Sequence, residues 1–161
     1  MIDKLTFVLL VDEKSQVLYR VARSILRSEE DCDDALQEGI LKAWASRHKL
    51  KDARYFATWI TRIVINECHN IKRKQAKYSL AADIEDDTTM SIPDIDLYNA
   101  LDALPASYRL PVVLHYVEGY SNKEIAALLR VPPVTVKNRL YAARKKLKLD
   151  LGEEEAQHCE A

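Results

Sequence analysis

The sequence predicts an all-α fold of two small helical domains, a three-helix bundle and a domain of four helices, joined by a flexible acidic linker. Its 161 residues include only 3 Gly and 5 Pro, too few for the many tight turns of an all-β chain. Hydrophobic residues make up 48% of the chain and recur at steps of three and four, the period of an amphipathic helix. A chain of this length and composition can bury a hydrophobic core.

Charge changes sign along the chain and marks the predicted domains. Residues 1–75 carry 14 basic and 11 acidic side chains, 76–100 carry 1 and 6, 101–150 carry 9 and 4, and 151–161 carry 0 and 4. We predict domains at 1–75 and 95–150, a linker at 76–94 that lacks a sustained helical period, and an acidic tail at 151–161. Two basic blocks suit two modules that face nucleic acid, although ordinary solvated charge explains the same pattern.

Three helices are predicted before the linker. The first carries an apolar stripe between residues 18 and 26. The second begins at residues 28–31, where a Ser side chain can cap the helix and acidic residues favour its positive end. The third begins near Phe56 and ends in a basic cluster at 72–74. Its inward residues are predicted to be Phe56, Trp59, Ile60, Ile63 and Val64.

Four shorter helices are predicted after the linker. Segments 95–104 and 107–118 flank Pro105, with Pro111 near the first turn of the second segment, where proline is tolerated. Ser121 and Glu124 have the spacing of a capping box and open the third helix. After a break at 130–131, Pro133 takes a first helical position and starts a long helix to residue 149. A short helix, a tight turn and a longer basic helix are typical of a helix-turn-helix.

The faces of the last helix follow from its period. Its inward residues are predicted to be Val136, Leu140, Ala143 and Leu147, and its outward residues Val134, Lys137, Asn138, Tyr141 and Lys145. In a major groove, Lys137 and Asn138 can donate to base edges and Tyr141 can contact a base or sugar. Phosphate contacts are predicted for Lys123, Thr135, Arg139, Arg144 and Lys146. A lone basic helix is usually a solvated surface, but the capped partner helix and the turn favour DNA binding.

The third helix is a second candidate site. Phe56 and Trp59 are normally core residues, yet the basic segment 46–55 precedes them and Asn66 lies among apolar neighbours. Asn66 is then either a satisfied core amide or a group that contacts an unstacked base.

Several strings together resemble an extracytoplasmic-function (ECF) sigma factor, a promoter-specificity subunit of bacterial RNA polymerase that contains only sigma regions 2 and 4. DDALQEGILKAW resembles the polymerase-binding helix, and FATWITRIVINECHNIKRK resembles the promoter-melting segment, which contains Trp59. After the linker, the strings LPASYR, YVEGYSNKEIA and TVKNRLYAAR resemble region 4. The resemblance covers about residues 15–149, in order and with family spacing.

The resemblance implies roles for individual residues. Asp34, Gln37 and Glu38 would bind a coiled coil of the polymerase's largest subunit. Residues from Ser46 to Lys51 would capture a flipped base of the minus-10 element, with Leu50 at a position that is often aromatic in relatives, and Asn66 would lie at the pocket edge. Nearby phosphates would be held by Arg62, Lys72 and Arg73, and the minus-35 element would be read by Lys137, Asn138 and Tyr141. Arg130 stands where relatives usually have Gly, so the turn either avoids positive φ or is mildly strained.

The resemblance also implies the partners. These are core RNA polymerase, through its largest-subunit coiled coil and its flap, promoter DNA, and an anti-sigma factor of the kind that is often anchored in the membrane. We expect no cofactor, metal or small-molecule substrate, and a monomer when free. The three cysteines are far apart and form no C-x-x-C pair, which indicates the reducing cytoplasm, and we find no apolar run of bilayer length and no secretion signal.

Two other classes of function compete with this interpretation. A stand-alone helix-turn-helix regulator would use its N-terminal bundle to sense or dimerise, and would need neither the polymerase-binding string nor the melting segment. An enzyme would have to use Cys68 and His69 or the acids near Asp33. Adjacent helix positions point about 100° apart, so Cys68 and His69 do not readily serve one reacting centre.

Overall fold

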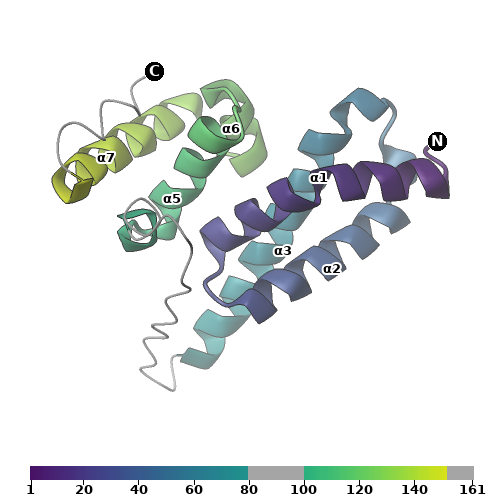
Figure 1. Cartoon of the computed structure of the whole chain (residues 1–161), viewed down its shortest axis with the longest axis horizontal. Helices are drawn as coiled ribbons and strands as arrows, with labels where there is room; N and C mark the ends of the chain where they lie inside the picture. Colours follow the sequence, from purple (N-terminus) through teal and green to yellow (C-terminus); the bar gives the residue numbers. More distant parts are fainter. Residues whose placement is uncertain (80–99, 152–161) are drawn as a thin grey trace. The chain divides into compact units, whose positions relative to one another are not determined.

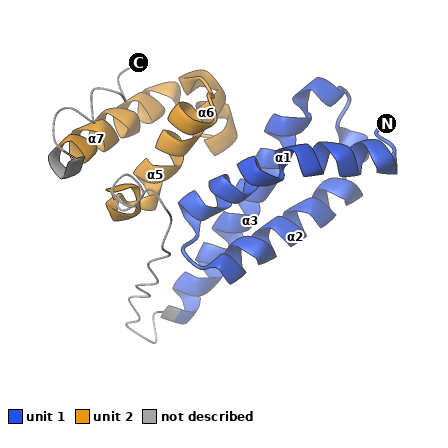
Figure 2. Cartoon of the chain, viewed as in Figure 1, with its two compact units in different colours: residues 1–88 blue, residues 89–161 orange. Residues whose placement is uncertain are grey.

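The computed structural model describes residues 1–79 and 100–151. The chain divides into two compact units, residues 1–88 and residues 89–161, coloured separately in Figure 2. Every regular element among the described residues is helical, which confirms the all-α prediction. The predictions for residues 80–94, the start of the helix at 95–104 and the acidic tail from residue 152 lie outside the described residues. No helix in the two described ranges is both long and apolar enough to cross a membrane.

The first unit is a bundle of three helices, α1 (Lys4–Ile25), α2 (Glu29–Ala45) and α3 (Phe56–Ser79), each packed against the other two (Figure 1). Side chains cap two of the helices: the Asp3 carboxylate accepts the Thr6 N–H at 2.9 Å, and the Ser28 hydroxyl accepts the Asp31 N–H at 3.3 Å. Two short 3₁₀ turns, η1 (Arg47–Lys49) and η2 (Ala53–Tyr55), connect α2 to α3.

The helix bounds of this unit differ from the prediction at two points. α1 begins at Lys4, well before the apolar stripe from which it was predicted, because Phe7 packs into the core. α3 continues to Ser79, past residue 76 where the linker was predicted to start. Residues 72–78 of α3 are exposed, so they carry no apolar period by which the sequence would mark the end of the helix.

Aromatic rings fill one end of the first core. The ring centroids of Phe7 lie 5.2 Å from Trp44 and 5.8 Å from Phe56, both in edge-to-face geometry. The Trp59 ring packs on Phe56 at 5.9 Å. α2 and α3 approach closely at Gly39, where an added Cβ would lie 3.0 Å from a Val64 methyl carbon. The aromatic cluster and the close contact at Gly39 therefore fix the packing of α2 against α3.

The second unit contains a helical segment at residues 100–103, then α5 (Ala106–Val112), a π-helical turn η3 (Val113–Val117), α6 (Asn122–Leu129) and α7 (Pro133–Leu151). Pro105 is the N-cap of α5, and Pro111 lies just past the first turn of this helix, close to the place predicted. Arg109 is buried beside this turn and donates from Nη2 to the Leu104 carbonyl at 3.0 Å.

The helix-turn-helix is formed by α6 and α7. Both hydrogen bonds of the predicted capping box are present: the Ser121 N–H donates to Glu124 Oε2 at 2.9 Å, and the Glu124 N–H donates to Ser121 Oγ at 3.2 Å. Arg130 takes a left-handed conformation with φ of 55°, so the turn carries the mild strain that a non-glycine residue meets there. Pro133 is the first residue of α7, as predicted.

Candidate polymerase and promoter interfaces

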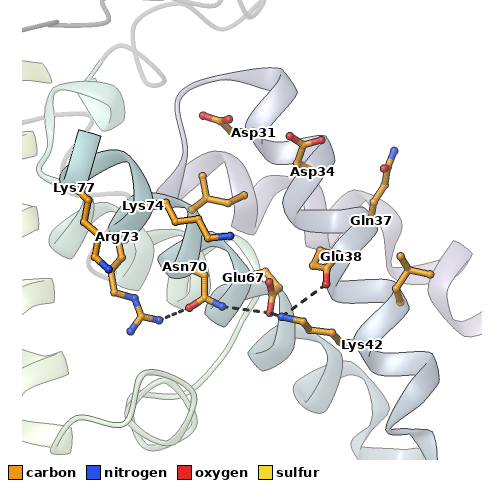
Figure 3. Close-up of a pocket in the computed structure, with 12 residues that line it drawn as sticks. Asp31, Asp34, Gln37, Glu38, Lys42, Glu67, Asn70, Arg73, Lys74 and Lys77 are labelled. Carbon is orange, nitrogen blue, oxygen red and sulfur yellow. Dashed lines mark hydrogen bonds and ion pairs between the residues drawn. The ribbon is translucent and has the colours of Figure 1, made fainter. Parts of the chain in front are cut away.

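The acidic face of α2 borders a groove between α2 and α3, with a volume of about 740 Å³ (Figure 3). Asp34, Gln37 and Glu38, the predicted polymerase contacts, are exposed and line one wall. Lysines and an arginine line the other wall, on α3: Arg73, Lys74 and Lys77. The predicted phosphate contact Arg73 thus borders the same groove as the predicted polymerase contacts, a juxtaposition that the sequence did not indicate.

A network of charged and polar side chains joins the two walls. Lys42 Nζ lies 2.6 Å from Glu67 Oε1 and 3.9 Å from Glu38 Oε1. Asn70 Nδ2 donates to the same Glu67 oxygen at 3.5 Å, and Arg73 donates to Asn70 Oδ1. The hydrogen bond to Glu67 raises the pKa of Lys42 above its usual value. This network fixes Glu38 and Arg73 at the groove.

Sequence reasoning missed the pair of Lys42 and Glu67. The Glu67 side chain is 10% exposed and lies next to the buried Cys68 on the inward part of α3. A buried carboxylate requires a charged or hydrogen-bonding partner. The position of Glu67 next to inward-facing residues of the helix would therefore have indicated that it has such a partner. Which residue supplies it depends on how α2 packs against α3.

The loop between α2 and α3 is ordered by its own hydrogen bonds. Ser46 Oγ donates to the Lys42 carbonyl at 2.7 Å, so this hydroxyl already serves the end of α2. The Arg47 guanidinium lies 3.7 Å from the Trp44 ring centroid and donates to the Trp44 carbonyl at 2.8 Å. Leu50 is half-buried and Lys51 is exposed. The loop therefore presents a small apolar side chain beside basic groups.

The solvent-facing side of α3 carries the other predicted minus-10 contacts. Asn66 is exposed, so it is not a core amide, and Arg62 and Arg73 share its face at helical spacing. Lys72 is also exposed, and Trp59 is half-buried against Phe56. His69 joins this face, and partial burial together with the positive charges of Lys72 and Arg73 lowers its pKa. A neutral imidazole therefore lies among the basic groups at neutral pH.

The two faces of α7 agree with the prediction. The four inward residues, Val136, Leu140, Ala143 and Leu147, are at most 1% exposed. On the outer face Val134, Lys137, Asn138, Tyr141 and Lys145 are exposed, as is Lys123 on α6. Thr135 and Arg139 are half-buried. The structure thus presents one polar, basic and aromatic surface along the recognition helix.

Two of the predicted phosphate contacts on α7 have partners within the second unit. Arg144 Nη1 donates to the Tyr116 hydroxyl at 2.9 Å. Lys146 Nζ lies 5.3 Å from the Tyr108 ring centroid. Both side chains therefore also hold α7 against the segment that precedes the helix-turn-helix.

The two described cysteines are buried and free. Burial is the main cause that raises the pKa of Cys32 to about 11 and that of Cys68 to about 12. Since the thiolate is the nucleophile, Cys68 is poorly suited to the role that an enzyme would require of it. Among the described residues no group of three or more His, Cys, Asp or Glu side chains is arranged to hold a metal ion.

These pKa values predict slow alkylation of both thiols. We expect iodoacetamide at pH 8 to modify Cys32 and Cys68 of the folded Cys159→Ser variant at least about 100-fold more slowly than in urea, because so little thiolate is present. Mass spectrometry of timed samples measures both rates. Rapid modification of either thiol in the folded chain would contradict this account of their environment.

Comparison with known proteins then identifies the family. The model of sigma-70 region 2 matches residues 10–78, and that of sigma-70 region 4 matches residues 94–147. The sigma factor SigV of Bacillus subtilis is 30% identical over 94% of this chain and 95% of its own length. The ECF sigma factor SigM of Mycobacterium tuberculosis is 34% identical over 93% of this chain and 79% of its own length. The chain is an ECF sigma factor.

Two solved structures share the fold. CnrH, in complex with the cytosolic domain of CnrY, has a TM-score of 0.68 and 28% identity over 94% of this chain and 92% of its own. RpoE from Bartonella quintana, in complex with the anti-sigma factor NepR, has a TM-score of 0.78 over 92% of this chain and 98% of its own, and at 24% identity supports the fold alone.

Membership of this family confirms the predicted function. As a sigma factor, the chain binds core RNA polymerase and promoter DNA and directs promoter-specific transcription initiation. The match of region 2 across the first unit rejects the stand-alone regulator, because that interpretation left the N-terminal bundle to sensing or dimerisation. Sigma factors are regulatory proteins, which agrees with the prediction that the chain is not an enzyme.

Proposed function

We propose that the two units of this sigma factor divide polymerase binding and promoter recognition. The unit predicted at residues 1–75, whose last helix extends to Ser79, binds core polymerase and the minus-10 element. The unit predicted at 95–150 reads the minus-35 element, and residues 76–94 connect them. The chain has no catalytic group of its own and acts in the cytoplasm, where its polymerase is.

The observation that carries the polymerase site is the exposed acidic face of α2. Asp34, Gln37 and Glu38 project into solvent from a helix that is fixed on its other side by buried contacts with α1 and α3. Rigid, exposed carboxylates can form charge-assisted hydrogen bonds with basic side chains of a partner without first reordering their own backbone.

This proposal predicts the effect of reversing two charges. The variant Asp34→Arg/Glu38→Arg is expected to bind core polymerase at least about tenfold more weakly, because two attractive contacts become repulsive. Fluorescence anisotropy of the labelled full chain, titrated with core polymerase at moderate salt, measures the Kd. The matched control is Asp12→Arg/Glu13→Arg, which makes the same charge change at exposed positions of α1. Equal affinities of the two double variants would contradict the assignment.

For the minus-10 element we propose contacts by the α2–α3 loop and the outer side of α3. Leu50 offers an apolar contact to a flipped base, and Asn66 can hydrogen-bond its edge. The proposed contacts in full are Ser46, Leu50, Lys51, Trp59, Arg62, Asn66, Lys72 and Arg73. Leu50 has no ring for stacking, which is worth roughly 1–3 kcal/mol per base, so discrimination here depends more on hydrogen bonds than on stacking.

For the minus-35 element we propose that α7 enters the major groove. Lys137 and Asn138 are exposed beside Tyr141 and carry the donors that base edges accept. The proposed phosphate and flanking contacts are Lys123, Thr135, Arg139, Arg144 and Lys145. The internal partner of Arg144 supports a role in which it orients α7 while it approaches the DNA backbone.

A protein inhibitor is also part of the proposal. Similar proteins have been captured with protein partners, RpoE with the anti-sigma factor NepR and CnrH with the cytosolic domain of CnrY. We propose that an anti-sigma factor, anchored in the membrane in many members of this family, holds this chain inactive by covering its polymerase-binding surfaces.

A further inference from the structure

Two lysines of the basic wall of the groove, Lys74 and Lys77 on α3, have no role in the assignments above. Both side chains are exposed and line the groove opposite the acidic wall of α2 (Figure 3). They follow Glu67 and Asn70 at steps of three and four, which places them along the side of α3 that borders α2. Their neighbour Lys72 does not line the groove.

The two walls carry opposite charges that do not neutralise each other. The structure gives Asp34, Lys74 and Lys77 no ion pair or hydrogen bond within residues 1–79 and 100–151. The polar interactions that do join α2 and α3 here are the network that runs from Glu38 through Lys42, Glu67 and Asn70 to Arg73 and the hydrogen bond that Gln75 Nε2 donates to Asp31 Oδ2 at 2.6 Å. The groove thus leaves a free carboxylate on one wall and free ammonium groups on the other.

This pattern of charge selects between the two macromolecular partners of the protein. A DNA backbone that approached Lys74 and Lys77 would also enter the field of the carboxylates of Asp31, Asp34 and Glu38, which line the same groove. Charges closer than the Debye length, about 8 Å at physiological salt, are only partly screened, so the carboxylates of the same groove offset the attraction of a phosphate to the lysines. A protein segment with carboxylates on one side and basic groups on the other satisfies both walls.

We propose that the groove seats a segment of core polymerase that places basic side chains against Asp34 and Glu38 and carboxylates against Lys74 and Lys77. Lys74 and Lys77 are then the second half of the polymerase interface and not phosphate contacts. The inference rests on the proposed polymerase site on α2 and adds the chemistry of the partner surface. The polymerase segment carries basic groups and carboxylates, separated by the width of the groove.

Charge reversal of the basic wall tests the inference. The full-length variant Lys74→Glu/Lys77→Glu is expected to bind core polymerase roughly tenfold more weakly. The matched control, Lys4→Glu/Lys14→Glu, makes the same charge change elsewhere in the first unit. Binding of single-stranded DNA by the free chain is measured in parallel. The expected result is a loss of polymerase affinity beyond that of the control, with DNA affinity equal to that of the control.

Two results would overturn the inference. Polymerase affinity equal to that of the control removes the basic wall from the interface, and a selective loss of DNA affinity assigns it to DNA. The variant Asp34→Arg/Glu38→Arg in the same assay tests the proposed polymerase site on α2 separately. If this variant binds polymerase weakly and the lysine variant binds normally, only the further inference is wrong; if Asp34→Arg/Glu38→Arg also binds normally, the α2 site is wrong as well. Helix content by circular dichroism shows whether each variant is folded. If Lys74→Glu/Lys77→Glu is not folded, the neutral variant Lys74→Gln/Lys77→Gln takes its place.

A second measurement needs no substitution. A carbodiimide joins a lysine amine directly to a carboxylate that contacts it, so we expect Lys74 or Lys77 in the complex with core polymerase to be linked to an Asp or Glu of the largest subunit. Peptide mass spectrometry identifies the linked residues. Links from lysines elsewhere in the first unit, with none from Lys74 or Lys77, would overturn the inference.

Discussion

Truncation of Phe56 to alanine is expected to lower the free energy of unfolding of the first unit by about 3–5 kcal/mol. The Phe56 ring is 2% exposed, and it lies between Phe7 and Trp59, at centroid distances of 5.8 and 5.9 Å. Its removal leaves a cavity in the aromatic cluster to which all three helices contribute rings. A loss of this size is a large part of the stability of a small domain, roughly 5–15 kcal/mol.

Tryptophan fluorescence during urea unfolding measures this loss in one unit alone. The chain has two tryptophans, and both belong to the first unit: Trp44 on α2 and Trp59 on α3. The control is Tyr55→Ala, which removes the exposed neighbouring ring and is expected to change the stability by less than about 1 kcal/mol. Similar midpoints for Phe56→Ala and the control would show that the Phe56 ring does not hold the core together.

Removal of the two polar side chains at the centre of the recognition surface is expected to reduce minus-35 selectivity strongly. Lys137 and Asn138 are exposed on α7, and each contact with a base edge is worth about 1–3 kcal/mol of discrimination. The variant Lys137→Ala/Asn138→Ala should therefore lose at least about tenfold in preference for its own minus-35 sequence, with the helix intact. In contrast, Lys123→Ala removes a proposed phosphate contact and should weaken initiation equally at all sequences.

Local signals allowed much of the fold to be predicted. The Ser28 cap, the capping box of Ser121 and Glu124, and the start of α7 at Pro133 each depend on residues within a few positions of one another, and all are present. The faces of α7 also followed from its period, because its buried residues contact neighbours on one side only. The string that contains the capping box, YVEGYSNKEIA, is also one of those that resemble the family.

What could not be predicted depends on contacts between distant residues. The pair of Lys42 and Glu67 joins residues 25 positions apart, and the bond from Arg144 to Tyr116 joins residues 28 apart. The groove exists only because α2 and α3 pack side by side, so the sequence did not indicate that Arg73 and the acidic residues of α2 line the same groove. The π-helical turn after Pro111 likewise has no local sequence signature.

The division of promoter recognition between the two units is the central claim, and mapped transcription in vitro tests it most directly. Core polymerase with the full chain transcribes fragmented genomic DNA of the source organism, and the 5′ ends of the transcripts locate the initiation sites. We predict a two-part motif upstream of these sites, of which Lys137→Ala/Asn138→Ala relaxes only the upstream element and Asn66→Ala only the downstream one. The account would be contradicted if either variant relaxed the element assigned to the other unit, or if either variant relaxed no element at all.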